Sequence, residues 1–99
     1  MADRYEGKAI GIFEVDNLVA AFVALDAASK AADVMIQAVE RNRLKSGACV
    51  KMRGNISDIK AAMEAAIAAA ERIGNVTAST IIASPTSDTE IAMKMTVNK

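Results

Sequence analysis

Residues 53–76 read RGNISDIKAAMEAAIAAAERIGNV, and this stretch decides the fold because it contains the clearest helix pattern in the chain. Its apolar side chains recur with the spacing of one face of an α-helix. These residues are Ile59, Met63, Ile67 and Ala70. Asn55 or Ser57 can cap the helix, and Asp58 lies in the first turn, where the helix dipole favours a negative charge. Gly74 is expected to end the helix in a left-handed conformation.

Short apolar runs bounded by turn residues predict four strands around this helix. They are residues 8–15 (KAIGIFEV), 34–39 (VMIQAV), 48–52 (ACVKM) and 76–83 (VTASTIIA). Arg53–Asn55 is expected to form the turn into the helix.

A second, Ala-rich helix is predicted over residues 18–30, after Asp16 and Asn17, which are natural N-cap residues. Its apolar stripe is predicted to consist of Leu18, Phe22 and Leu25, with Val19 and Ala28 beside them. Beyond Pro85, Thr86 or Ser87 can cap a short and loosely held C-terminal helix. That helix would contain Ile91, Met93 and Met95.

The order of these elements is strand–helix–strand–strand–helix–strand, followed by the short C-terminal helix. This order predicts an α+β fold of the split βαβ, ferredoxin-like kind, with a four-stranded antiparallel sheet and both main helices on one face. We expect a single domain over residues 8–85, an N-terminal segment over residues 1–7, and a C-terminal helix and tail over residues 86–99.

The composition argues against several classes of function. The charges cancel, with 12 basic and 12 acidic residues, so no overall field favours nucleic acid or a membrane surface. The chain has no histidine and one cysteine, which removes the usual general base and the common metal ligands. No catalytic residue, metal or cofactor is therefore predicted. We expect Cys49 to be a small buried residue, and Glu14, Asp16 and Asp26 to cap turns or face solvent.

Two stretches together resemble the single-domain, hexamer-forming shell proteins of bacterial microcompartments. The first is AIGIFEVDNLVAAFVALDAASKAADV, residues 9–34, which is similar to the family's strand "AxGxxE" and alanine-rich helix. The second is residues 53–76, which is similar to the family's "RGDV" turn and following helix. In this order the pair covers most of the chain.

The resemblance implies a structural subunit that forms flat homo-hexamers. These would tile with neighbouring hexamers and other shell proteins around encapsulated enzymes in the bacterial cytoplasm. It also implies that the loop between the second and third strands lines a pore on the sixfold axis. Here the loop comprises Arg41, Asn42, Arg43, Leu44, Lys45, Ser46 and Gly47. The implied contacts at the hexamer edge are Lys30, Asp33 and Ser84.

The chain departs from the family pattern at two of these places. Its loop has one glycine and three basic residues where many members have a glycine-rich "K-I-G-S-G" loop, and residues 34–54 form a segment one residue longer than the commonest pattern. Residues 83–86 read Ala-Ser-Pro-Thr in place of "P-R-P-H", so the edge contact would be weaker or made differently. We expect a basic pore for small polar or anionic metabolites, in which some of the loop's basic side chains point away from the opening or pair with Glu40.

Two other classes of function are compatible with the fold. The first is a regulatory module that binds a small metabolite between subunits, and the second is an enzyme. A ligand-dependent dimer would indicate the regulator, and measured turnover would indicate the enzyme. The missing histidine and the lack of a convergent polar site disfavour the enzyme.

Overall fold

The computed structural model describes residues 5–42 and 46–97, with side chains described up to Met95. The strands are β1 (Ala9–Val15), β2 (Met35–Arg41), β3 (Ala48–Gly54) and β4 (Val76–Ile82). The helices are α1 (Leu18–Ala31), α2 (Ile56–Ala70) and α3 (Ser87–Val97). This order confirms the predicted sequence of elements.

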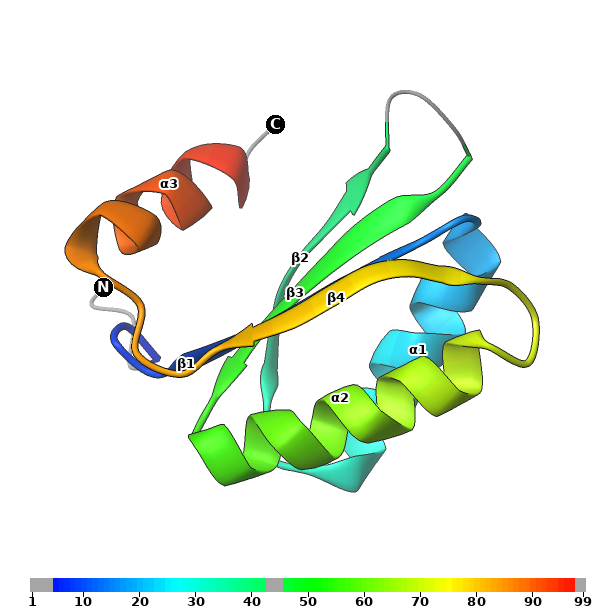
Figure 1. Ribbon diagram of the computed structural model, residues 1–99, viewed down its shortest axis with the longest axis horizontal. Helices are drawn as coiled ribbons and strands as arrows, with labels where there is room; N and C mark the ends of the chain where they lie inside the picture. The colour runs from blue at the N-terminus through cyan, green and yellow to red at the C-terminus, as the bar shows by residue number, and fades with distance from the viewer. Residues whose placement is uncertain (1–4, 43–45, 98–99) are drawn as a thin grey trace.

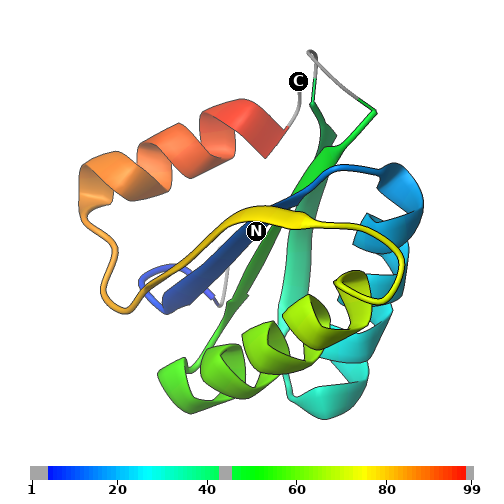
Figure 2. The same cartoon turned by 45° about the vertical axis from the view of Figure 1, so that its right-hand side comes forward.

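The four strands form one antiparallel sheet in the order β2-β3-β1-β4. Helices α1 and α2 cover one face of it, whereas α3 lies across from them, beyond the other face (Figures 1 and 2). The predicted ferredoxin-like α+β fold is therefore confirmed. We call the face away from α1 and α2 the open face. It carries Ile12 and Glu14 of β1, whose neighbours Phe13 and Val15 point into the helix-side core.

Alanine forms most of the contact between the helices and the sheet. The fully buried alanines of the two helices are Ala20, Ala21, Ala24, Ala28, Ala62, Ala66 and Ala70. Side chains this small let the two helices approach each other and the sheet closely, while Phe13, Met52 and Ile59 supply the bulk of the core.

The apolar stripe predicted for α1 is confirmed at Leu18, Leu25 and Ala28, which pack against or within the core, and wrong at Phe22 and Val19. Phe22 is 54% exposed and Val19 is 67% exposed, and the alanine side of the helix faces the core instead. Both sides of α1 are apolar, so periodicity alone could not choose between them. The alanine side is buried because it allows close contact with α2, whereas a Phe at the same place would hold the helices apart.

The starts and ends of the helices match the expectations in part. Asn17 caps α1, because its side-chain oxygen accepts a hydrogen bond of 2.7 Å from the Ala20 N–H. Thr86 similarly accepts from the Thr89 N–H at 3.2 Å at the start of α3. The left-handed end predicted at Gly74 is wrong, since Gly7 is the one glycine with positive φ among the described residues. Position 74 instead favours glycine because there is little room for a side chain: a Cβ there would collide with the Asn17 side chain.

The turn predicted at Arg53–Asn55 is also wrong in part, because β3 continues to Gly54 and Arg53 is fully buried on the open face. Its guanidinium forms two bonds with the Glu90 carboxylate of α3, at 2.9 Å and 2.6 Å. It also donates to the carbonyls of Tyr5 at 3.0 Å and Lys8 at 3.1 Å. This paired arrangement ties α3 and the N-terminal segment to the sheet, so α3 is not loosely held.

Glu90 depends on this arrangement for its charge state. Hydrogen bonding from Arg53 lowers the pKa of the Glu90 carboxyl below its ordinary value, and the Gly7 N–H, which donates at 2.8 Å, acts in the same direction. The charged form of Glu90 is therefore the form that the folded chain stabilises.

We predict that Glu90→Gln lowers the free energy of unfolding at pH 7, by up to the roughly 3–5 kcal/mol that breaking a buried ion pair costs. Because the folded pKa lies below the unfolded one, the pair stabilises fully above the unfolded pKa, and that stability is lost as pH falls through the folded pKa. Urea unfolding at pH 7 and pH 4, at one protein concentration, should show the difference between wild type and variant shrinking in acid.

Glu6→Gln is the matched control for this experiment, because Glu6 pairs with Lys94 at the surface, where the interaction is worth about 0–1 kcal/mol. An equal effect of the two substitutions at pH 7 would contradict the role given to Glu90.

We predict that Ala66→Leu destabilises the chain by about 1–3 kcal/mol, because the added atoms have no space between α2 and its neighbours. Ala68→Leu, on the exposed side of the same helix, should change the free energy of unfolding little. Thermal and urea unfolding of both variants test this, and similar values would show that α2 is not closely packed.

Candidate functional site

The loop between β2 and β3 is the candidate site, and the structure describes both of its ends. Arg41 is exposed at the end of β2, and Asn42 is half-buried after it. On the return side Ser46 is exposed and Gly47 is buried before β3. The Asn42 N–H donates to the Gly47 carbonyl at 2.9 Å, which closes the loop at its base. Arg43, Leu44 and Lys45 lie outside the described residues.

Glu14 of β1 holds the start of this loop. Its Oε2 accepts a hydrogen bond from the Asn42 side chain at 3.2 Å, and its Oε1 accepts one from the Thr77 hydroxyl at 3.0 Å. The sequence prediction of a solvated or turn-capping Glu14 missed this contact. The available signal was a single carboxylate inside an otherwise apolar strand.

The return side of the loop is held by Val15, the last residue of β1, and by Asp16, which follows it. Ser46 donates to the Asp16 carbonyl at 3.3 Å. Gly47 lies so close to the Val15 carbonyl that no Cβ would fit. Asp16 in turn accepts bonds of 2.9 Å from both the backbone and the side chain of Asn75, which lower the pKa of its carboxyl. Both ends of the loop therefore rest on residues 14–16.

Glu40, which was expected to pair with the loop's basic residues, pairs with a residue of β3 instead. Glu40 forms an ion pair with Lys51 of the neighbouring strand, on the open face of the sheet. This pair is largely buried, with 10% of the Lys51 side chain exposed. The expected pairing of Glu40 with the loop's basic residues is therefore wrong for the part of the loop that the structure describes.

The three residues predicted at the hexamer edge are all exposed. Lys30 lies in the last turn of α1 and pairs with Asp26 at 2.8 Å, which raises the pKa of Lys30. Asp33 lies between α1 and β2, and Ser84 lies between β4 and α3. Within the protomer Lys30 thus has a partner on its own helix.

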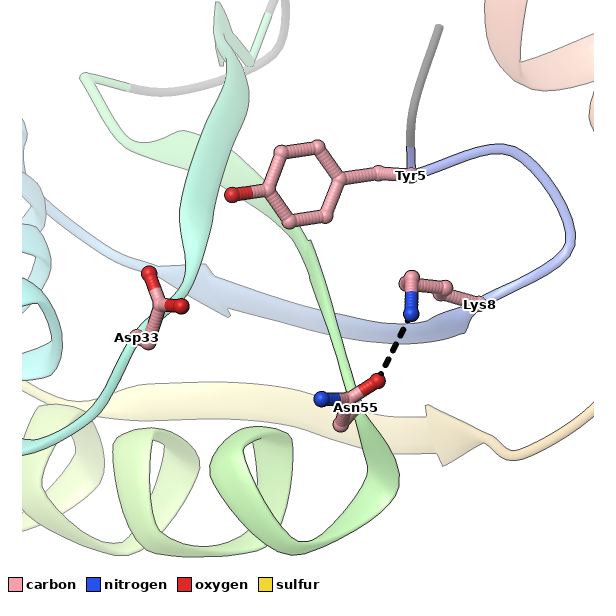
Figure 3. A pocket seen from close by; sticks show the side chains of 4 residues that line it. All are labelled: Tyr5, Lys8, Asp33 and Asn55. Carbon is pink, nitrogen blue, oxygen red and sulfur yellow. Dashed lines mark hydrogen bonds between the residues drawn. The ribbon is translucent and has the colours of Figure 1, made fainter.

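Asp33 also borders a pocket of about 190 Å³, shown in Figure 3. The other lining residues are Tyr5, Lys8 and Asn55, and the Lys8 ammonium donates to the Asn55 side chain at 2.8 Å. This contact explains why Asn55 forms no side-chain cap on α2, although it occupies the N-cap position.

The open face near the loop forms a hollow of about 270 Å³, which includes Ile12, Glu14 and Thr80. Cys49 borders it and is half-buried, less buried than the sequence indicated. Burial raises the pKa of the Cys49 thiol, so the thiolate is disfavoured. Within residues 5–42 and 46–97 no group of three or more His, Cys, Asp or Glu side chains could hold a metal ion.

An apolar stripe remains uncovered on α1. Val19, Phe22 and Val23 are 67%, 54% and 43% exposed, and the last two lie about one helical turn after Val19 on the same side of the helix. Farther along the same helix is the ion pair of Asp26 and Lys30. No helix in the described part of the chain is long and apolar enough to cross a membrane.

Comparison with models of known protein families identifies the family of the chain. A family model described as "BMC domain" matches residues 9–85, which include every strand of the sheet. The chain belongs to the BMC domain family. The resemblance noted from residues 9–34 and 53–76 is thereby confirmed.

Curated relatives of this BMC domain chain are shell proteins. It is 39% identical over 84 residues to the bacterial microcompartment shell protein PduA of Citrobacter freundii, covering 84% of this chain and 88% of the relative. It is also 39% identical over 84 residues to the shell protein EutM of Escherichia coli (strain K12), covering 84% of each. These relatives are structural proteins, which confirms the prediction that the chain is not an enzyme.

A solved structure, of a microcompartments protein from Desulfitobacterium hafniense, shares the fold of the BMC domain chain. The two superpose with a TM-score of 0.76 at 21% sequence identity, over 88% of this chain and 47% of the other. At that identity the likeness concerns the fold alone.

Proposed function

We propose that the chain is a structural subunit of a bacterial microcompartment shell, and that six copies close into a ring with loop 41–47 around a central pore. The observation that carries this proposal is the BMC domain match over residues 9–85, together with shell-protein relatives that the chain covers over most of their length. The protein would then reside in the shell, inside the cell.

The exposed stripe of α1 supports an assembly of several copies. A Phe and two Val side chains on one helix side form a patch of the kind that subunit interfaces cover. We propose that Val19, Phe22 and Val23 are buried against another copy of the chain. Lys30, Asp33 and Ser84 would contact neighbouring hexamers and other shell proteins, and enzymes would be enclosed behind the shell.

The described ends of the loop support its role as a pore lining. They are closed by a backbone hydrogen bond and held against β1, so the same segment would be presented in every copy. The loop carries Arg41, Arg43 and Lys45. In a ring these charges are repeated around a narrow opening, which favours the passage of small anionic or polar metabolites over cations.

The proposal is tested by negative-stain microscopy of the purified chain, which should reveal rings and sheets. Phe22→Ser should weaken the contact between copies by about ten- to a hundredfold, since burying a Phe contributes roughly 1.5–3 kcal/mol. Ile73→Ser is the control, because Ile73 is 47% exposed but lies outside the stripe. Equal assembly of the two variants would contradict the role of the stripe.

Substituting serine for Arg41, Arg43 and Lys45 together should leave ring formation intact and lower the preference for anions. The measurement is the rate at which an anionic and a cationic fluorophore of similar size enter shells assembled with either form of the chain. If the ratio of the two rates stays the same, the loop does not determine selectivity.

A further inference from the structure

We propose that Glu14 is a positioning residue that holds Asn42, the first residue after β2, against β1 and so fixes the base of loop 41–47. The inference rests on the proposed function only where it treats that loop as the pore lining. The anchoring itself is argued from contacts within one protomer. The predicted pore lining consists of residues 41–47 alone and assigns no role to Glu14, which is 28 residues before Asn42.

The location of Glu14 suits this role. It lies near the end of β1, a central strand, opposite Cys49 of β3 and Ala78 of β4. Its two carboxylate oxygens are used separately, Oε2 by the Asn42 side chain and Oε1 by the Thr77 hydroxyl. The carboxylate therefore joins the first residue of the loop to the strand on the other side of β1.

An irregularity in the sheet places Thr77 where Glu14 needs it. The β1–β4 register shifts between Glu14 and Val15, so that Thr77 is an extra residue between Val76 and Ala78. A bulge of this kind re-aims a side chain, and here the Thr77 hydroxyl reaches both the backbone carbonyl and the carboxylate of Glu14, at 3.3 Å and 3.0 Å. The bulge thus places the Thr77 hydroxyl beside the Glu14 carboxylate.

A carboxylate is the side chain that this position requires. Both partners donate hydrogen bonds, and an ionised carboxylate offers an acceptor oxygen to each of them. A glutamine has one acceptor oxygen, so its amide nitrogen would face one of the two donors. The contact therefore predicts a graded series in which Glu14→Gln is partly impaired and Glu14→Ala is fully impaired.

The test measures opening of the loop in the full-length chain. Trypsin cleaves after arginine and lysine, so the loop supplies its own cleavage sites at Arg41, Arg43 and Lys45, and mass spectrometry identifies them. Hydrogen exchange at the Asn42 N–H, which is bonded to Gly47, reports the same opening without a protease. Glu6→Gln is the control, because Glu6 is a surface carboxylate that pairs with Lys94 rather than with a residue at the base of the loop.

We expect Glu14→Ala to raise both rates about tenfold, the effect of losing a hydrogen bond to a charged group. Glu14→Gln should raise them less, and Glu6→Gln should leave them unchanged. Combining Glu14→Ala with Asn42→Ala should add little to the stronger single effect, because the contact between Glu14 and Asn42 is already lost in either single variant. General destabilisation would instead give additive effects and would overturn the proposal, as would wild-type rates in Glu14→Ala.

Thr77→Val keeps the inference testable if Glu14→Ala does not fold, because it removes one donor with little change of shape and should raise the rates modestly. Unchanged rates in Thr77→Val and Glu14→Gln would overturn the proposal. Solution mass measured on the same samples separates this inference from the ring. Rings without any effect of Glu14 refute the positioning role, whereas a monomer that shows the graded effect supports it and refutes the pore.

Discussion

The buried ion pair between Arg53 and Glu90 is the interaction on which the open side of the structure depends. A fully buried guanidinium is unfavourable unless it is paired, and here its two terminal nitrogens donate to Glu90 and to the carbonyls of Tyr5 and Lys8, while its Nε has no hydrogen-bond partner in the described part of the chain. One side chain of β3 therefore fixes the positions of α3 and the N-terminal segment. With these held at one end of the sheet, its other end, near Glu14, remains available to support the loop.

The order and type of the elements could be predicted because strands and helices have different apolar periods, and the helix containing Ile59 and Met63 has a single apolar side. The orientation of α1 could not, because both of its sides are apolar. Burial was decided by how closely α1 and α2 approach, which favours alanine over Phe22. The role of Arg53 was missed because its partner lies 37 residues away in the sequence.

The candidate loop was located by resemblance, and its supports could not be found that way. Glu14 contacts residues 28 and 63 positions away, so no local pattern reveals the pairing. The fold contributes a loop whose two ends are held by residues 14–16, at the end of the central strand β1. The apolar stripe containing Phe22 remains uncovered within the protomer, and the proposed contact with another copy would cover it. The protomer thus has the features of a repeating part in a larger assembly.

The mass of the purified chain in solution, measured by sedimentation at physiological salt, tests the central claim most directly. The account predicts a particle of six chains, or larger sheets built from such particles. A single chain that remains stable and dispersed at working concentration would contradict it, because the exposed stripe of α1 would then need no partner and the loop would have no ring to line.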